Sequence, residues 1–206
     1  MSLRDRIWYP ILYMAAITLI SSAIIILFGS LTRQRVQDNQ LIAFERAVLG
    51  ALHIGEQELS SPSAIHTAYS TLIRKPDESS AGAFRFIKDD SLIAYALPLE
   101  GPGFWAPIKG IIGILADRKT VTGIAFYEQN ETPGLGGEIV KSAFTEQFKG
   151  KILSDVDPAL SIVPVSVVLD EHRVHAVTGA TQTSTRLAEF MNETIVAWRN
   201  RMKREE

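Results

Sequence analysis

The chain of 206 residues contains no cysteine. Disulfide bonds, thiolate-bound zinc, cysteine-ligated iron–sulfur clusters and thioether-linked haem are therefore excluded. Charge of one sign is not in excess either, because the formal net charge is only −2. We accordingly expect no nucleic-acid partner. Any redox chemistry of this chain has to use a cofactor other than those that cysteine holds.

Several familiar site patterns are missing as well. Neither glycine-rich segment matches the spaced-glycine dinucleotide fingerprint or lies in a predicted βαβ unit, which argues against nicotinamide binding. The absence of a Gly-x-Ser-x-Gly elbow argues against a hydrolase. His172 and His175 lack a third ligand at supportive spacing, so we interpret them as surface or strand-end residues. We predict no metal site, no catalytic residue and no independent catalysis.

One long apolar run is present near the N-terminus. Residues 7–31 carry no charged side chain, and as a helix of about 1.5 Å per residue they would cross a hydrocarbon core about 30 Å thick. Trp8, Tyr9 and Tyr13 gather at one end, as side chains at a lipid–water boundary do. A cleaved signal peptide would have a shorter core and would end in small residues, so we favour an uncleaved anchor. Arginines on both sides leave its orientation open.

The remaining chain predicts an α+β fold. We divide it into an anchor over residues 1–32, a helical stalk and linker over 33–82, and a globular domain over 83–206. No helical crossover fits between the apolar strand 108–116 and the strand 121–127, so this pair is antiparallel. We therefore expect a single N-terminal transmembrane helix followed by a mixed, largely antiparallel sheet with flanking helices.

Further elements are expected from turn and capping signals. They are a helix over 64–73 capped by Ser63, a polar loop over 75–82, a loop over 101–107 with Phe104 and Trp105 exposed, a helix over 138–147 ended by Gly150 with Ile139, Phe144 and Phe148 facing the core, a strand over 162–169 interrupted by Pro164, and a basic tail over 199–204. We interpret this tail as a solvated helix end that complements the helix dipole. A docking surface for a partner subunit is the alternative.

Hydroxyl side chains gather where the last helix is expected to begin. From Leu187 onward apolar residues recur with helical spacing, at Leu187, Phe190, Met191, Ile195 and Trp198. The upstream hydroxyls are Thr181, Thr183, Ser184 and Thr185, which is more than one helix cap requires. A helix N-terminus also favours a phosphate, because its N–H groups are unpaired and the dipole is positive there. Taken alone, the pattern is more typical of simple capping.

Two segments together carry a family resemblance. They are Glu131-Thr132-Pro133-Gly134-Leu135-Gly136-Gly137-Glu138-Ile139 and Thr178-Gly179-Ala180-Thr181-Gln182-Thr183. They resemble the FMN-binding domain of the G subunit of Rnf complexes and of the C subunit of the sodium-translocating NADH:quinone reductase. Segments 101–108 and 147–151 resemble family segments in the same order. With the anchor, the resemblance covers nearly the whole chain and makes residues 83–206 the FMN-binding domain.

The resemblance implies covalently bound FMN. In the family, the last residue of Ser/Thr-Gly-Ala-Thr-x-Thr/Ser carries FMN through a phosphoester bond, and this residue is Thr183 here. The other residues expected to bind the cofactor are Thr178, Gly179, Ala180, Thr181, Ser184, Glu131, Thr132, Gly134, Leu135 and Trp105. One position departs from the family: His175 stands where an Asp is usual.

The resemblance also implies a place in the cell and a set of partners. The chain would be a single-pass protein of the inner, cytoplasmic membrane, with its globular domain on the periplasmic side. Its partners would be the other subunits of a membrane-bound redox complex, a flavin transferase during maturation, and the lipid bilayer. Its function would be to relay electrons within an ion-translocating Rnf-type complex.

Three alternatives stay open. The Gly-Phe-Trp and Gly-Gly-Glu-Ile segments favour the C subunit of the sodium-translocating quinone reductase, whereas the short length favours the Rnf type, which we place first. A flavin-free anchored scaffold module is a second alternative, because His175 replaces the expected Asp. The third is an anchored flavin reductase outside any ion pump.

Overall fold

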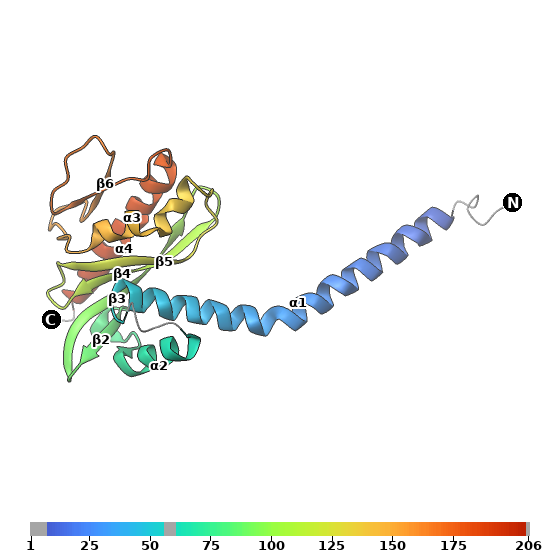
Figure 1. The fold of residues 1–206 in the computed structure, drawn as a ribbon, viewed down its shortest axis with the longest axis horizontal. Coiled ribbons are helices and arrows are strands. Elements are labelled where there is room, and N and C mark those ends of the chain that lie inside the picture. Colours follow the sequence, from blue (N-terminus) through green and yellow to red (C-terminus); the bar gives the residue numbers. More distant parts are fainter. Residues whose placement is uncertain (1–7, 56–60, 205–206) are drawn as a thin grey trace. The chain divides into compact units, whose positions relative to one another are not determined.

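A computed structural model describes residues 8–55 and 61–204. The chain forms two compact units, residues 1–41 and residues 42–206 (Figure 1). Helix α1 (Trp8–Ala51) contributes to both. The predicted helices over the apolar run and over the stalk are thus confirmed from Trp8 onward, as one uninterrupted helix.

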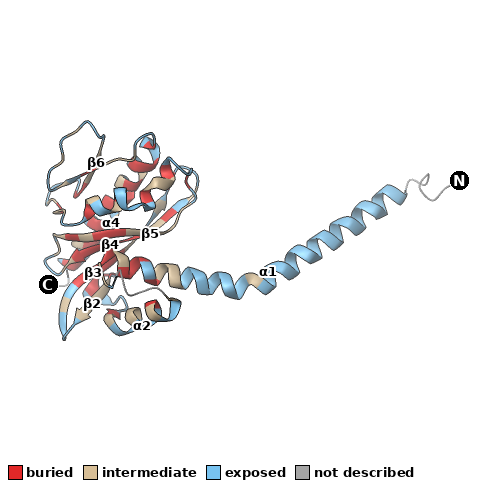
Figure 2. Ribbon diagram, viewed as in Figure 1, coloured by how far each residue is buried: buried red, intermediate tan, exposed pale blue. Residues whose placement is uncertain are grey.

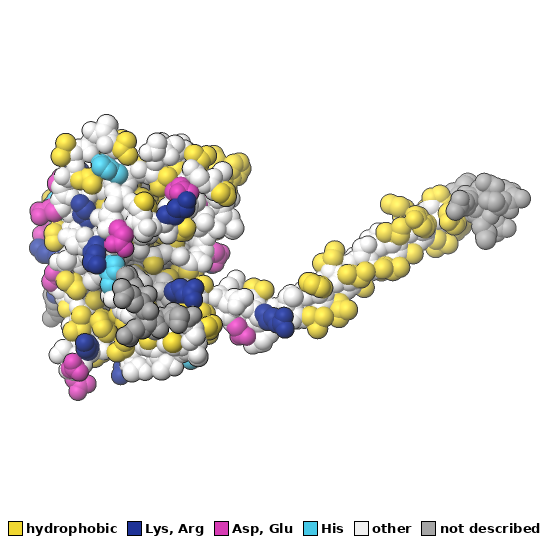
Figure 3. Space-filling view, in the orientation of Figure 1, with side chains coloured by type: hydrophobic (Ala, Val, Ile, Leu, Met, Phe, Trp, Pro, Cys, Tyr) yellow, Lys and Arg dark blue, Asp and Glu magenta, His cyan; other side chains and the backbone are white. Residues whose placement is uncertain are grey.

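The described part of the first unit consists of the apolar stretch of α1 and the more polar part of the same helix up to Leu41. Its large apolar side chains are exposed, from Trp8 at 73% to Leu31 at 68% (Figures 2 and 3). By length and composition, α1 is the one helix among the described residues that could cross a membrane. A helix with apolar side chains exposed all round is expected of a segment surrounded by lipid. That the anchor is uncleaved stays a prediction.

The second unit is built on an antiparallel sheet, as predicted. Its strands, in spatial order, are β1 (Ile73–Arg74), β2 (Phe84–Lys88), β3 (Ser91–Pro102), β4 (Pro107–Leu115) and β5 (Val121–Glu128). Each pairs antiparallel with the next. The β2–β3 turn consists of Asp89 and Asp90, both with positive φ, which suits the tight turns that join twisted strands. The α+β fold class is confirmed.

Two helical layers cover the two faces of the sheet (Figures 1 and 2). Helix α4 (Thr181–Met202) packs against one face, where the side chains are large; they include Tyr95, Leu97, Leu99, Ile108, Ile112 and Ile114. The end of α1 and helix α2 (Pro62–Leu72) pack against the other face, where the strands present Ala94, Ala96 and Ile111. The predicted apolar stripe of α4 is fully buried, which confirms the helical spacing.

Glycine makes room for the end of α1. Gly113 and Gly123 face each other across β4 and β5. A Cβ on Gly113 would overlap the Ala51 carbonyl oxygen and the Thr122 hydroxyl, and the same carbonyl lies 3.1 Å from a Cβ built on Gly123. Thr122 Oγ1 donates a hydrogen bond to Ala51 O at 2.6 Å. The last turn of α1 therefore rests on sheet backbone at a distance that only glycine allows.

The C-terminal half of α4 is fixed by polar contacts. Asn192 Oδ1 accepts from Leu160 N at 2.9 Å, and Asn192 Nδ2 donates to Leu160 O at 2.8 Å. Trp198 Nε1 donates to Ser80 O at 3.0 Å. These side chains satisfy buried backbone groups of two segments distant in sequence. The helix thereby holds the segments around Ser80 and Leu160 in place.

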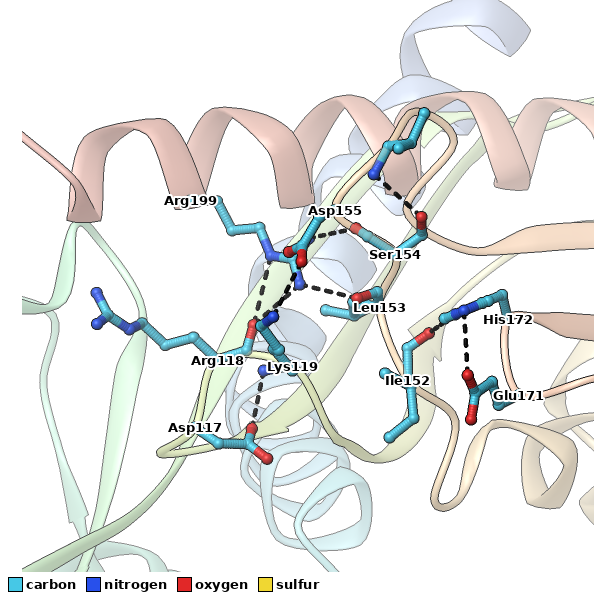
Figure 4. A network of polar contacts seen from close by, with 11 residues as sticks. Asp117, Arg118, Lys119, Ile152, Leu153, Ser154, Asp155, Glu171, His172 and Arg199 are labelled. Atoms are coloured by element: carbon cyan, nitrogen blue, oxygen red, sulfur yellow. Dashed lines mark hydrogen bonds and ion pairs between the residues drawn. The ribbon is translucent and has the colours of Figure 1, made fainter.

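The basic tail differs from the prediction at its first residue. Arg199 is half-buried and donates to the carbonyl oxygens of Ser154 at 2.6 Å, Arg118 at 3.1 Å and Leu153 at 3.2 Å (Figure 4). A planar guanidinium with five donors can collect several carbonyl groups in this way. The solvated-tail prediction is therefore wrong for Arg199. The other basic side chains of the tail are exposed, as predicted.

Two predicted elements have different bounds. Helix α2 begins at Pro62 and is capped by Ser61, whose Oγ accepts from Ala64 N, instead of by Ser63. The strand predicted over 162–169 is only β6 (Ser161–Val163), because Pro164 has no N–H to continue it. It pairs in parallel with β7 (Arg173–His175), forming a separate two-stranded sheet.

The helix predicted over 138–147 is broken into short turns. They are η3 (Gly136–Val140), α3 (Ser142–Thr145) and η4 (Glu146–Phe148). Lys141 between them is extended, with φ −83° and ψ 149°, which interrupts the helical hydrogen bonds. The apolar residues predicted to face the core, Ile139, Phe144 and Phe148, are nevertheless buried. A further short turn, η2 (Glu78–Ser80), lies in the predicted loop over 75–82.

We predict that Gly113→Ala lowers the free energy of unfolding by about 1–3 kcal/mol, because the added methyl group overpacks the contact with Ala51. The matched control is Gly50→Ala. A Cβ at Gly50 meets only Ala125 Cβ at an ordinary 3.8 Å. Because Gly50 lies in a helix, we expect Gly50→Ala to leave the free energy of unfolding unchanged or to raise it by up to about 1 kcal/mol. Urea unfolding of the detergent-solubilised chain measures both. Equal stability of the two variants would contradict the close-approach argument.

Candidate functional site

Three segments meet around one cavity of the second unit. The cavity has a volume of about 340 Å³ and lies among the loop after β3, the loop after β5 and the start of α4. It is lined by Phe104, Trp105, Glu131, Thr132, Leu135, Gly136, Gly179, Ala180, Thr181, Gln182 and Thr183. The two motifs that carry the family resemblance therefore lie together in space, although about 50 residues separate them in sequence.

Not every residue proposed from the sequence lines this cavity. Thr178 and Ser184 line a neighbouring cavity of about 300 Å³, which shares Gly179 and Thr181 with the first. Gly134 lies at the exposed tip of its loop with φ +76°, where a residue without Cβ is favoured. It therefore shapes the loop, and its N–H donates to Glu138 Oε1 at 3.1 Å.

Glu131 joins the three segments through one carboxylate. Its Oε1 accepts from the backbone N–H groups of Phe104 at 2.7 Å and Trp105 at 3.1 Å. Its Oε2 accepts from the Thr183 hydroxyl at 2.7 Å. Glu131 is 6% exposed and Thr183 is 3% exposed. A buried carboxylate needs such donors, and here they come from two different parts of the site wall.

Two glycines, Gly103 and Gly136, leave the space that the Glu131 carboxylate occupies. A Cβ on Gly136 would lie 2.6 Å from Glu131 Oε2 and 2.5 Å from Thr183 Oγ1. A Cβ on Gly103 would overlap Glu131 Oε1. Because real side chains do not approach so closely, both positions exclude any side chain while the contact exists. Neither Gly103 nor Gly136 was among the residues predicted to bind the cofactor, although both lie inside the recognised segments.

The start of α4 does not follow the predicted capping. The helix begins at Thr181, its N-cap position is Ala180, and no side chain caps it. Ser184 Oγ instead accepts from Val177 N at 3.3 Å, and Thr183 donates to Glu131. The prediction that the hydroxyls cap this helix is therefore wrong. An uncapped helix start lines the cavity, which is the arrangement that favours a bound phosphate.

Two exposed aromatic side chains, Phe104 and Trp105, line the cavity. Trp105 is 69% exposed and Phe104 is 46% exposed, which confirms the predicted exposed pair, and their rings lie edge to face at 4.9 Å. Trp105 Nε1 donates to Thr132 Oγ1 at 3.2 Å. Arg186 Nη1, from α4, donates to Gly103 O at 2.7 Å. The aromatic loop is thus tethered to the other two segments, and Arg186 is a contributor that the sequence pattern did not reveal.

His175 lies at the end of β7 and does not line either cavity. Its backbone N–H donates to Gln147 Oε1 at 2.7 Å, and its Nε2 lies 3.0 Å from Val167 O. The strand-end interpretation is confirmed for this residue. Across residues 8–55 and 61–204, no group of three or more acidic, histidine or cysteine side chains could hold a metal ion.

The site offers two exposed aromatic side chains, an uncapped helix start and a single buried carboxylate–hydroxyl pair. These features suit a planar aromatic ligand with a phosphate group better than a small polar metabolite.

We predict that Thr183→Val destabilises the flavin-free protein by about 1–3 kcal/mol, because Glu131 Oε2 then loses its donor in a buried place. Thr185→Val is the matched control, since Thr185 is exposed in the same helical turn. Urea unfolding of both variants, produced without any flavin transferase, measures the difference. A Thr183→Val midpoint equal to that of the control would show that the contact adds nothing to stability.

Comparison with known proteins places the cavity inside a recognised domain. Residues 103–196 match the FMN-binding domain. The chain is 39% identical over 110 residues to the C subunit of the Na(+)-translocating NADH-quinone reductase of Vibrio vulnificus, a match that covers 52% of this chain and 43% of the relative. For the same subunit of Neisseria meningitidis the identity is 40% over 99 residues, with coverage of 47% and 38%. The match spans less than half the length of these relatives.

Two solved structures share the fold. The C subunit of the Na(+)-translocating NADH-quinone reductase from Parabacteroides distasonis superposes with a TM-score of 0.70 at 24% identity, covering 82% of this chain and 96% of that one. NqrC of Shewanella oneidensis gives a TM-score of 0.61 at 23% identity, with coverage of 78% and 96%. The resemblance predicted from the two motifs is thus confirmed: residues 103–196 match the FMN-binding domain, and the chain has the fold of these two quinone reductase structures.

Proposed function

We propose that this chain is a membrane-anchored flavoprotein subunit that bears FMN covalently on Thr183 and relays electrons within a Na+-translocating NADH:quinone reductase type of complex. The main support for the proposal is that Thr183, the uncapped start of α4 and the Trp105 side chain all line one cavity within the matched domain. FMN would supply the reversible gain and loss of electrons, whereas the protein supplies attachment and orientation.

Different residues of the cavity would bind the phosphate and the ring system of FMN. The backbone N–H groups at the start of α4, near Thr181 and Gln182, would bind the phosphate. The side chains of Trp105 and Leu135, both partly exposed beside the cavity, would pack against the flat ring system. Glu131 would hold the two loops in place through its contacts with the 104–105 backbone.

The sequence left two complex types open, with the Rnf type first. We now place the quinone reductase type first, because the relatives described above are C subunits of that enzyme. Since the match spans less than half of those relatives, the other subunits, the coupling ion and the flavin transferase are part of the proposal. So is a location in the inner membrane with residues 42–206 on the periplasmic side.

A flavin-free scaffold is the weaker candidate. It depended on His175, which replaces the usual Asp of the family. His175 lies outside both cavities, so its side chain leaves the proposed flavin contacts intact. Any effect of the replacement would be on recognition by a transferase and not on the shape of the cavity.

The test is in-gel flavin fluorescence after denaturation in SDS, together with the intact mass, on protein from a host that contains a flavin transferase. We expect the wild-type band to fluoresce and to be heavier than the unmodified chain by one FMN less one water. Thr183→Val should be dark and of unmodified mass, and the matched control Thr185→Val should behave as wild type. A dark wild-type band of unmodified mass would refute covalent flavin, and a fluorescent Thr183→Val band would refute this attachment site.

A further inference from the structure

The motif around Thr183 presents more hydroxyls than one attachment needs. Thr178, Thr181, Thr183, Ser184 and Thr185 lie within eight residues, and among the described contacts only the Thr183 hydroxyl donates to a carboxylate. Thr178, Thr181 and Thr185 are more exposed than Thr183, and Ser184 Oγ accepts from a backbone N–H. Exposure alone would favour modification of the wrong residues. Some other property has to distinguish Thr183.

We propose that Glu131 is the general base of flavin attachment, so that this chain supplies the group that activates its own acceptor hydroxyl. The inference rests on the proposed function, because it concerns how Thr183 receives FMN. Glu131 is the only ionisable side chain among the residues that line the cavity in the described structure. Its Oε2 is already at hydrogen-bond distance, 2.7 Å, from the atom that has to lose a proton.

The reaction balances without any oxidant or reductant. The donor is a flavin adenine dinucleotide presented by a transferase. Thr183 Oγ1 attacks the phosphorus on the flavin side, a new O–P bond forms, and the hydroxyl proton passes to Glu131 Oε2. The bond between this phosphorus and the bridging oxygen breaks, and AMP leaves with the electron pair. The proton on Glu131 is then released to solvent, and FMN stays attached as a phosphodiester.

The rest of the site supports this role for Glu131. Its Oε1 is fixed by the N–H groups of Phe104 and Trp105, so Oε2 is left to face Thr183. Gly136 leaves no side chain that could come between Oε2 and the Thr183 hydroxyl, and Gly103 leaves room for Oε1. A base held by two backbone donors and aimed at one hydroxyl distinguishes this hydroxyl from its neighbours. Selectivity for Thr183 then follows from the contact and not from accessibility.

The experiment measures the rate of flavin transfer under single-turnover conditions. It uses the full-length, detergent-solubilised and flavin-free chain with a purified flavin transferase, Mg²⁺ and flavin adenine dinucleotide. Glu131→Gln has nearly the same shape but cannot take the proton, so we expect a rate about 10²–10⁴-fold lower. The transferase concentration that gives half the maximal rate should be unchanged.

Glu138→Gln is the matched control. Glu138 lies in the same part of the chain, and its hydrogen bond to Lys141 at 2.7 Å lowers the pKa of this carboxyl below its ordinary value. The control therefore removes a charge of the same kind close by, and we expect transfer within about twofold of wild type, in the range of a surface change.

A second variant keeps the test decisive if Glu131→Gln folds poorly. Glu131→Ala leaves space for a small carboxylate, and added formate should restore part of its rate, whereas formate should have no effect on Glu138→Gln. Wild-type transfer to Thr183 together with an equally fast Glu131→Gln would overturn this inference alone, as would a slow Glu131→Ala that formate does not rescue. A wild-type chain that receives no flavin at all would instead overturn the proposed function.

Discussion

The hydrogen bond between the Glu131 carboxylate and the Thr183 hydroxyl is the contact on which the site depends. One buried carboxylate accepts donors from the loop after β3 and from α4, while its own backbone belongs to the loop after β5. A charge this deeply buried would be costly without those donors. The same requirement therefore brings the three segments around the cavity together and fixes the position of the Thr183 hydroxyl.

The fold provides a rigid support for that contact. Large apolar side chains hold α4 on one face of the sheet, whereas glycine and alanine let the end of α1 approach the other face closely. Asn192, Trp198 and Arg199 bind backbone groups of distant loops, so the C-terminal half of α4 is fixed. Its uncapped start can then face a ligand without the helix shifting, which is how strained or unsatisfied groups persist at functional sites.

Patterns that depend on neighbouring residues were predictable from the sequence. The buried strand β4, the antiparallel β4–β5 pair, the apolar stripe of α4 and the exposed Phe104–Trp105 pair all follow from local periodicity or polarity. The errors came from distant contacts. Capping was the more typical interpretation of the hydroxyls at the start of α4, but the Thr183 hydroxyl bonds to a carboxylate 52 residues away. Arg199 was expected in solvent, but it collects carbonyl groups that are 45 and more residues away. No local pattern contains that information.

We propose that Thr183 alone among the hydroxyls of its motif receives the flavin, because it alone donates a hydrogen bond to Glu131. The most direct measurement is fragment-ion mass spectrometry of the tryptic peptide 174–186, taken from protein made in the presence of a flavin transferase. This single peptide contains Thr178, Thr181, Thr183, Ser184 and Thr185. We expect the whole FMN mass to be on Thr183. FMN on Thr181, Ser184 or Thr185, or spread over several of these residues, would contradict it.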